Sequence, residues 1–62
     1  MDLAKIRETK KMTQQELSEA VGLTRQTISA YENGVAKPSP EKAKKIAEIL
    51  GFDWTLFYEE RR

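Results

Sequence analysis

The chain has 62 residues, 11 of them basic and 10 acidic, with a net charge of +1 and neither cysteine nor histidine. This length suits one small domain, 1–62, which hides only about 60% of the surface of its unfolded chain, and the composition excludes disulfides and the usual zinc sites. No apolar run is long enough for a signal peptide or a membrane span, so we expect a soluble, cytoplasmic protein. Because the net charge is small, any contact with nucleic acid requires positive charge gathered on one face.

Five helical patterns follow one another along the chain. Aspartate, threonine or serine opens the first four, and glycine ends three of them, as helix starts and ends favour. No segment has the alternation of a strand, so the predicted fold class is all-α. The patterns cover Asp2 to about Lys10, Thr13 to Gly22, Thr24 to Gly34, Ser39 to Gly51, and Trp54 to about Glu59.

Two of the helix starts are specific. The run from Thr13 to Glu16 is a capping box, in which hydroxyl and carboxylate satisfy each other's backbone amides. Ser39 and Pro40 stand in the favoured order of a cap followed by proline at the first helical position. Helical spacing then predicts apolar faces made of Leu3 and Ile6; Leu17, Ala20 and Val21; Ile28 and Tyr31; and Ala43, Ile46, Ala47 and Leu50.

The segment from Gln14 to Tyr31 is the most informative part of the chain. It contains two short helices joined by a turn of three or four residues that includes Gly22. Leu23 and Ile28 are placed to pack beneath this turn, which makes the second helix cross the first steeply. In this layout the second helix projects from the body and can enter a major groove of DNA. Helical proteins that never meet DNA use the same turn, so the turn alone does not decide the function.

The outward face of the projecting helix favours DNA. It consists of Arg25, Gln26, Ser29 and Ala30. Arginine bonds guanine at two atoms, glutamine does the same to adenine, and alanine can meet the methyl group of thymine. An ordinary solvated helix face is rich in lysine and glutamate, whereas this one has no lysine and no acid before Glu32.

The motifs of the chain, taken together, resemble one family. They are Ile6-Arg7-Glu8, Met12–Leu17, Val21–Ser29, Tyr31–Gly34, Pro38-Ser39 and Ile46–Phe52. They resemble the Cro/CI-type (XRE-like) helix-turn-helix domains of phage and bacterial repressors over nearly the whole chain. The resemblance implies a compact five-helix bundle of the lambda-repressor-like DNA-binding type, with the helix-turn-helix at helices 2 and 3, and a bacterial, phage or plasmid origin.

The same resemblance implies a function. We expect a sequence-specific regulator of double-stranded DNA, a repressor, that inserts helix 3 into the major groove as a homodimer on a palindromic operator. Half-sites about 34 Å apart suit such a dimer. The dimer either exists in solution or forms only on the DNA. No cofactor, metal, membrane or small-molecule ligand is expected.

The resemblance also implies roles for individual residues. Base reading falls to Arg25, Gln26, Ser29 and Ala30, and phosphate binding to Gln14, Thr24, Thr27, Asn33 and Lys37. Gln14 would also brace the recognition helix. Arg7 and Glu32 resemble a partly buried ion pair that joins helix 1 to the end of helix 3. The alternative, two surface charges, would contribute little to stability.

Two features leave alternatives open. Ser18 stands where the family commonly has alanine, so its hydroxyl needs a partner. Lys10 and Lys11 either touch backbone phosphate or favour the negative end of helix 1.

The carboxyl-terminal end is rich in aromatic residues. Phe52 and Phe57 are expected in the core. Trp54 and Tyr58 share one face, which with Leu56 nearby either contributes to a dimer contact or packs internally. The last residues, 59–62, read as a solvated end.

Three other functions are less favoured. An enzyme would need paired carboxylates in a cleft, but the acids lie at caps and outer faces, as Glu16, Glu41 and Glu48 do. An RNA-binding protein would show exposed aromatics among basic residues. The main alternative is a protein-interaction module, such as an antitoxin or a bundle that binds a regulatory partner.

Overall fold

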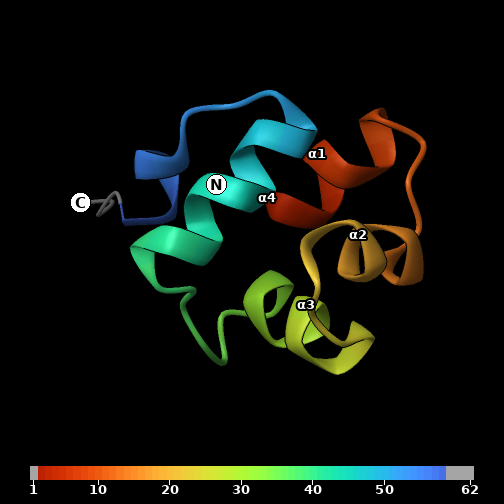
Figure 1. Cartoon of the computed structure of the whole chain (residues 1–62), viewed down its shortest axis with the longest axis horizontal. Helices are drawn as coiled ribbons and strands as arrows, with labels where there is room; N and C mark the ends of the chain where they lie inside the picture. The colour runs from red at the N-terminus through yellow and green to blue at the C-terminus, as the bar shows by residue number, and fades with distance from the viewer. Residues whose placement is uncertain (1, 59–62) are drawn as a thin grey trace.

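The computed structural model describes residues 2–58, which form four α-helices and one 3-10 helix (Figure 1). The all-α prediction is confirmed over these residues, none of which is in a strand. The expected fifth α-helix is instead a 3-10 helix of five residues, and the expected solvated end at 59–62 lies outside the described residues. The elements are α1 (Leu3–Thr9), α2 (Gln14–Val21), α3 (Arg25–Glu32), α4 (Pro40–Leu50) and η1 (Trp54–Tyr58).

Local side-chain chemistry sets the starts of the four α-helices. The N-cap side chains of Asp2, Thr13, Thr24 and Ser39 each accept a backbone N–H three residues further on. At α2 the capping box is complete, because Glu16 N donates to Thr13 Oγ1 at 3.0 Å and Thr13 N donates to Glu16 Oε1 at 2.9 Å. Such caps replace the intrahelical partners that the first amides lack.

The core is small and lies where α1, α2, α3 and α4 meet. Its central cluster of buried apolar side chains consists of Leu3, Leu17, Val21, Ile28, Ile46 and Leu50. Six half-buried side chains pack against them: Ile6, Met12, Leu23, Tyr31, Phe52 and Phe57. The inner stripe predicted for α4 is confirmed, since Ala43, Ile46, Ala47 and Leu50 are all buried.

The predicted inner face of α2 was wrong at one position. Ala20 is exposed, whereas Ser18 is 1% exposed and faces the core between Leu17 and Val21. The hydroxyl of Ser18 donates to the carbonyl oxygen of Gln15 at 2.8 Å, so this buried polar group is satisfied within its own helix. α2 packs against both α3 and α4, and its face at 17, 18 and 21 is the buried one.

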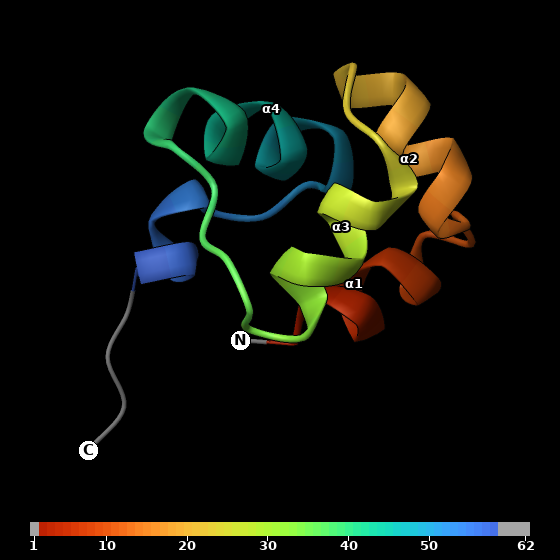
Figure 2. The same ribbon diagram turned by 90° about the horizontal axis from the view of Figure 1, so that it is seen from below.

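The helices are arranged so that α3 lies at the surface on one side of the bundle. Figure 2 shows α3 near the middle of the view, with α4 above it and to the left, α2 above it and to the right, and α1 below it on the right. The one residue that α3 buries completely is Ile28. The outer side of α3 therefore remains open.

The aromatic residues after α4 tie η1 to the rest of the molecule. The rings of Phe52 and Phe57 lie 5.5 Å apart between centroids, and both pack against the core as predicted. Trp54 and Tyr58 meet edge to face at 5.9 Å, and the Tyr58 hydroxyl donates to the carbonyl oxygen of Pro38 at 2.6 Å.

Among the described helices, none combines the length and the apolar content that a membrane span needs.

Candidate nucleic-acid interface

The turn between α2 and α3 presents α3 outward. It consists of three residues, because α2 ends at Val21 and α3 begins at Arg25. Gly22 adopts a left-handed conformation (φ 74°) that lets the chain leave α2, and Leu23 then packs against the core. Thr24 caps α3 by accepting Thr27 N at 3.2 Å, and the two threonine hydroxyls share a hydrogen bond of 2.9 Å. The first turn of α3 is thus held firmly at the surface.

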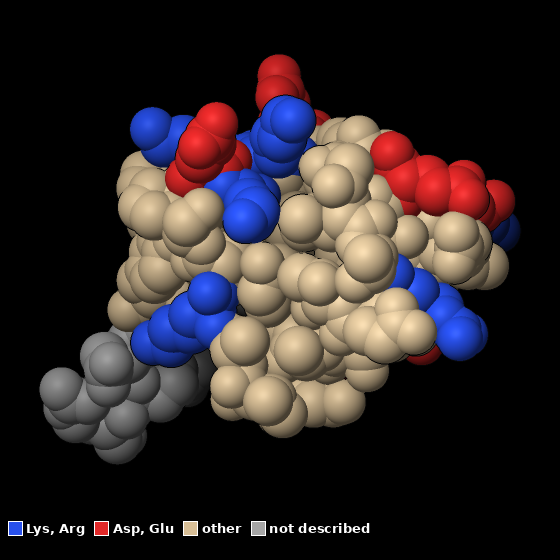
Figure 3. Space-filling view, turned by 60° about the horizontal axis from the view of Figure 1, so that its bottom comes forward, with Lys and Arg blue, Asp and Glu red and all other residues tan. Residues whose placement is uncertain are grey.

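The four side chains predicted to read bases lie on the open side of α3. Arg25 and Gln26 are exposed, and Ser29 and Ala30 are half-buried. Figure 3 shows this side of the molecule: acidic groups lie mainly along its upper margin, and the broad centre is uncharged with Lys and Arg at its edges. A surface of this kind can approach a negatively charged duplex without repulsion from carboxylates.

Three polar side chains from three helices meet behind this face. The Arg7 guanidinium donates through Nε to Glu32 Oε2 at 2.6 Å, and Gln14 Nε2 donates to Glu32 Oε1 at 2.9 Å. Arg7 Nη1 also donates to the carbonyl oxygen of Met12 at 2.7 Å. The side chains of Arg7 and Glu32 are 10% and 6% exposed, so the predicted pair is present and largely buried. We call Arg7, Gln14 and Glu32 the polar clamp.

The clamp is electrostatically consistent. The hydrogen bond that Arg7 donates to Glu32 raises the pKa of Arg7 above its ordinary value, outweighing the opposing effect of burial. No buried side-chain nitrogen or oxygen in residues 2–58 lacks a hydrogen-bond partner. A satisfied buried network of this kind favours one relative orientation of the helices that carry it. Here these helices are α1, α2 and α3, so the clamp joins α3 to both of the other two.

The predicted phosphate-binding residues fall into two groups on either side of the base-reading face. Gln14, Thr24 and Thr27 lie at the starts of α2 and α3, whereas Asn33 caps the end of α3 and Lys37 is exposed in the loop that follows. Asn33 Nδ2 lies 3.3 Å from Ser29 Oγ, which joins the second group to the reading face. The structure brings Gln14 into the clamp but does not bring the two groups together.

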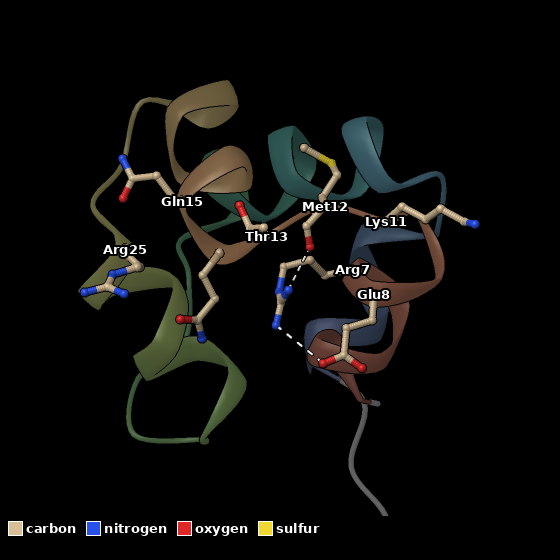
Figure 4. Close-up of a pocket in the computed structure, with 8 residues that line it drawn as sticks. Arg7, Glu8, Lys11, Met12, Thr13, Gln15 and Arg25 are labelled. Carbon is tan, nitrogen blue, oxygen red and sulfur yellow. Dashed lines mark hydrogen bonds and ion pairs between the residues drawn. The ribbon is translucent and has the colours of Figure 1, made fainter.

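A shallow, open pocket of about 530 Å³ lies between the α1–α2 turn and the start of α3 (Figure 4). Its lining includes Arg7, Lys11, Thr13, Gln14, Gln15 and Arg25. In Figure 4, Arg25 and Lys11 lie on opposite rims, with Gln15 on the side of Arg25 and Thr13 between the two rims. No role was predicted for Gln15 from the sequence, and Lys10 and Lys11 were given the same two alternatives. The capping box that opens α2 contributes to the lining of this pocket, but its pattern was interpreted only as a helix start.

Comparisons with known proteins agree with this geometry. Residues 3–57 match the helix-turn-helix family. An uncharacterized HTH-type transcriptional regulator, YqaF of Bacillus subtilis, is 47% identical over 58 residues, which are 94% of this chain and 76% of that protein. An uncharacterized HTH-type transcriptional regulator of Methanothermobacter thermautotrophicus is 53% identical over 49 residues, 74% of this chain and 71% of its own length. The chain therefore belongs to the helix-turn-helix family, in the XRE-like group of transcriptional regulators whose Cro/CI-type domains its sequence resembles.

Proposed function

We propose that this protein is a cytoplasmic, sequence-specific repressor that binds double-stranded DNA by inserting α3 into the major groove. The observation that carries the proposal is the open side of α3. Arg25 and Gln26 are exposed there, and the clamp behind α3 holds it at one angle. Side chains that bond two atoms of a base need a fixed helix angle, because a bidentate contact tolerates little displacement.

We assign base reading and phosphate binding to individual residues according to their positions on α2, α3 and the loop that follows α3. Arg25 and Gln26 read bases from the first turn of α3, and Ser29 and Ala30 read from the next. Thr24, Thr27 and Gln14 bind phosphate on one side of the groove, and Asn33 and Lys37 bind it on the other. Contacts to phosphate on both sides set the register of the helix, whereas contacts to base edges choose the sequence.

The clamp gives Gln14 a double role. Its amide nitrogen donates to Glu32 at the end of α3, and its side chain lines the pocket beside Arg25. A phosphate that bonds Gln14 therefore contacts a residue already joined to the recognition helix. In this way Gln14 links the position of the DNA backbone to the position of α3.

One copy of α3 can contact only a few base pairs, too few for useful specificity in a genome. We therefore propose that two copies bind a palindromic operator as a homodimer, with half-sites about 34 Å apart. The protein itself performs no catalysis; it acts by occupying the operator.

Selection from random duplex DNA tests this function, followed by titration of the selected site at two salt concentrations. We expect an enriched inverted repeat and an affinity that falls steeply as salt rises, because several phosphate contacts release counterions. A duplex of scrambled sequence serves as the control. If no site is enriched, and binding is weak and limited to low salt, the proposal is wrong and a protein-interaction module becomes the better candidate.

A further inference from the structure

Two adjacent lysines at the end of α1 have different surroundings. Lys10 is the C-cap of α1, and its side chain lies against the far end of α4. A methyl group placed on Gly51, the C-cap of α4, would lie 3.5 Å from Lys10 Nζ. The last carbonyl groups of a helix carry partial negative charge, so an ammonium group is stabilised there. The fold itself thus accounts for Lys10.

The fold accounts for the backbone of Lys11 but not for its side chain. Its backbone has a positive φ of 59°, the one such value at a non-glycine position in residues 2–58. A lysine in this left-handed conformation is less stable than a glycine would be. Its side chain is exposed, and no described carboxylate pairs with its ammonium group, since the ion pairs within residues 2–58 all involve Arg7. The helix end explains this backbone: Lys11 N donates to the carbonyl oxygen of Glu8 at 2.8 Å and Met12 N to that of Arg7 at 3.2 Å, which closes α1. The exposed ammonium group has no such structural role and invites a functional explanation.

The position of Lys11 supplies one. Lys11 lines the shallow pocket whose opposite rim is Arg25, the first residue of α3. Arg7 also lines the pocket, but its guanidinium is already bonded to Glu32 and to the carbonyl oxygen of Met12. Glu8 is the one acidic residue in the lining, on the same rim as Lys11. Lys11 therefore supplies the free positive charge of that rim.

We infer that Lys11 is a further contact to the DNA backbone, beyond the residues named above, and that Lys10 is not. This inference rests on the proposed function. With α3 in the major groove, Arg25 faces the bases and the pocket beside it faces the adjoining strand. The outer rim then meets the phosphates of that strand, where the long, flexible stem of Lys11 can bring its ammonium group to a phosphate oxygen. The contact is independent of sequence, because phosphates carry no base identity.

The two lysines provide a matched pair for the test. Lys11→Gln and Lys10→Gln remove the same charge from neighbouring positions, and both are titrated against the selected operator over a range of salt. We expect the slope of log K against log salt to fall by about one for Lys11→Gln, the loss of one phosphate contact. For Lys10→Gln we expect the wild-type slope. We also expect a lower melting temperature, because the ammonium group of Lys10 no longer lies at the C-terminal end of α4.

A third variant separates contact from structure. Lys11→Gly relieves the left-handed backbone, so its melting temperature should rise while its affinity for DNA falls several-fold. A lysine with a merely structural role would not produce these opposite changes. Equal salt slopes for the two glutamine variants, or wild-type affinity in Lys11→Gly, would overturn the inference about Lys11. The proposed function would still stand in that case, because the wild-type protein binds its operator. A wild-type protein with no enriched site and no salt dependence would overturn the proposed function and this inference together.

Discussion

The two ends of the long axis of the molecule are built on different principles. At one end α1, α2 and α3 are joined by the polar clamp, with hydrogen bonds of 2.6 and 2.9 Å onto Glu32. At the other end η1 has no fully buried residue and is held by half-buried aromatic rings and by the bond from Tyr58 to Pro38. Apolar contacts are non-directional and tolerate small shifts, whereas the clamp works in one geometry. The directional interactions are placed behind the helix that must present its side chains accurately.

The largest expected effect comes from breaking the clamp. Arg7→Ala leaves Glu32 and the Met12 carbonyl without their partner in a largely buried site, so the free energy of unfolding should fall by about 3–5 kcal/mol. Urea denaturation measures it, with Glu32→Gln as a milder variant of the same site. Glu8→Ala is the control, because Glu8 is 70% exposed and lies 3.9 Å from Arg7, and it should change stability little. Similar losses in Arg7→Ala and Glu8→Ala would contradict a special role for the clamp.

A smaller effect is expected at the aromatic end. Tyr58→Phe removes the hydrogen bond to Pro38 while keeping the ring against Trp54, so the free energy of unfolding should fall by about 1 kcal/mol. Tyr31→Phe is the matched control, since the Tyr31 hydroxyl has no hydrogen-bond partner within residues 2–58. The same urea experiment compares the two. A loss in Tyr58→Phe as large as in Arg7→Ala would remove the contrast between the two ends.

The smallest expected effect concerns the turn that opens η1. Thr55 donates to Asp53 Oδ1 through its backbone nitrogen at 3.0 Å and its hydroxyl at 2.8 Å, and these bonds lower the pKa of Asp53. A lowered pKa means stabilisation that is present above the ordinary value for aspartate, about 3.9. It is lost as the pH falls through the lowered pKa. In Thr55→Val the backbone bond remains and the hydroxyl bond is gone, so the pKa of Asp53 should rise toward its ordinary value. An NMR titration of the Asp53 carboxyl group measures this, and an unchanged pKa would show that the hydroxyl is unimportant.

Local chemistry made the helices and their ends predictable from the sequence. The caps at Thr13 and Thr24 and the glycine stops at Gly22 and Gly51 act within a few residues, so the sequence contains them in full. Helical spacing identified the buried stripe of α4 for the same reason. The 3-10 geometry of η1 was not predicted, because a five-residue segment depends on what it packs against.

Long-range geometry limited the prediction of the site. Ser18 is buried in place of Ala20, because which face of α2 is covered depends on how α3 and α4 pack against it. That Gln14 braces the recognition helix was predicted from the resemblance alone, and its partner Glu32, 18 positions away, was not predicted. The environments of Lys10 and Lys11 depend on the distant Gly51 and Arg25. Spacing patterns describe neighbours within one helix, so they do not predict contacts between residues that are far apart in the sequence. The base-reading and phosphate-binding roles remain predictions.

The most direct test of the central claim is to repeat the selection with Gln26→Ala and Gln14→Ala beside the wild-type protein. Gln26 is exposed on the first turn of α3, so its loss should weaken binding by about 1–3 kcal/mol and relax the preference at one base position in each half-site. Gln14→Ala should weaken all sites more evenly and leave the preferred sequence intact. If Gln26→Ala selects the wild-type site with the same preference at every position, α3 does not read the bases through this face.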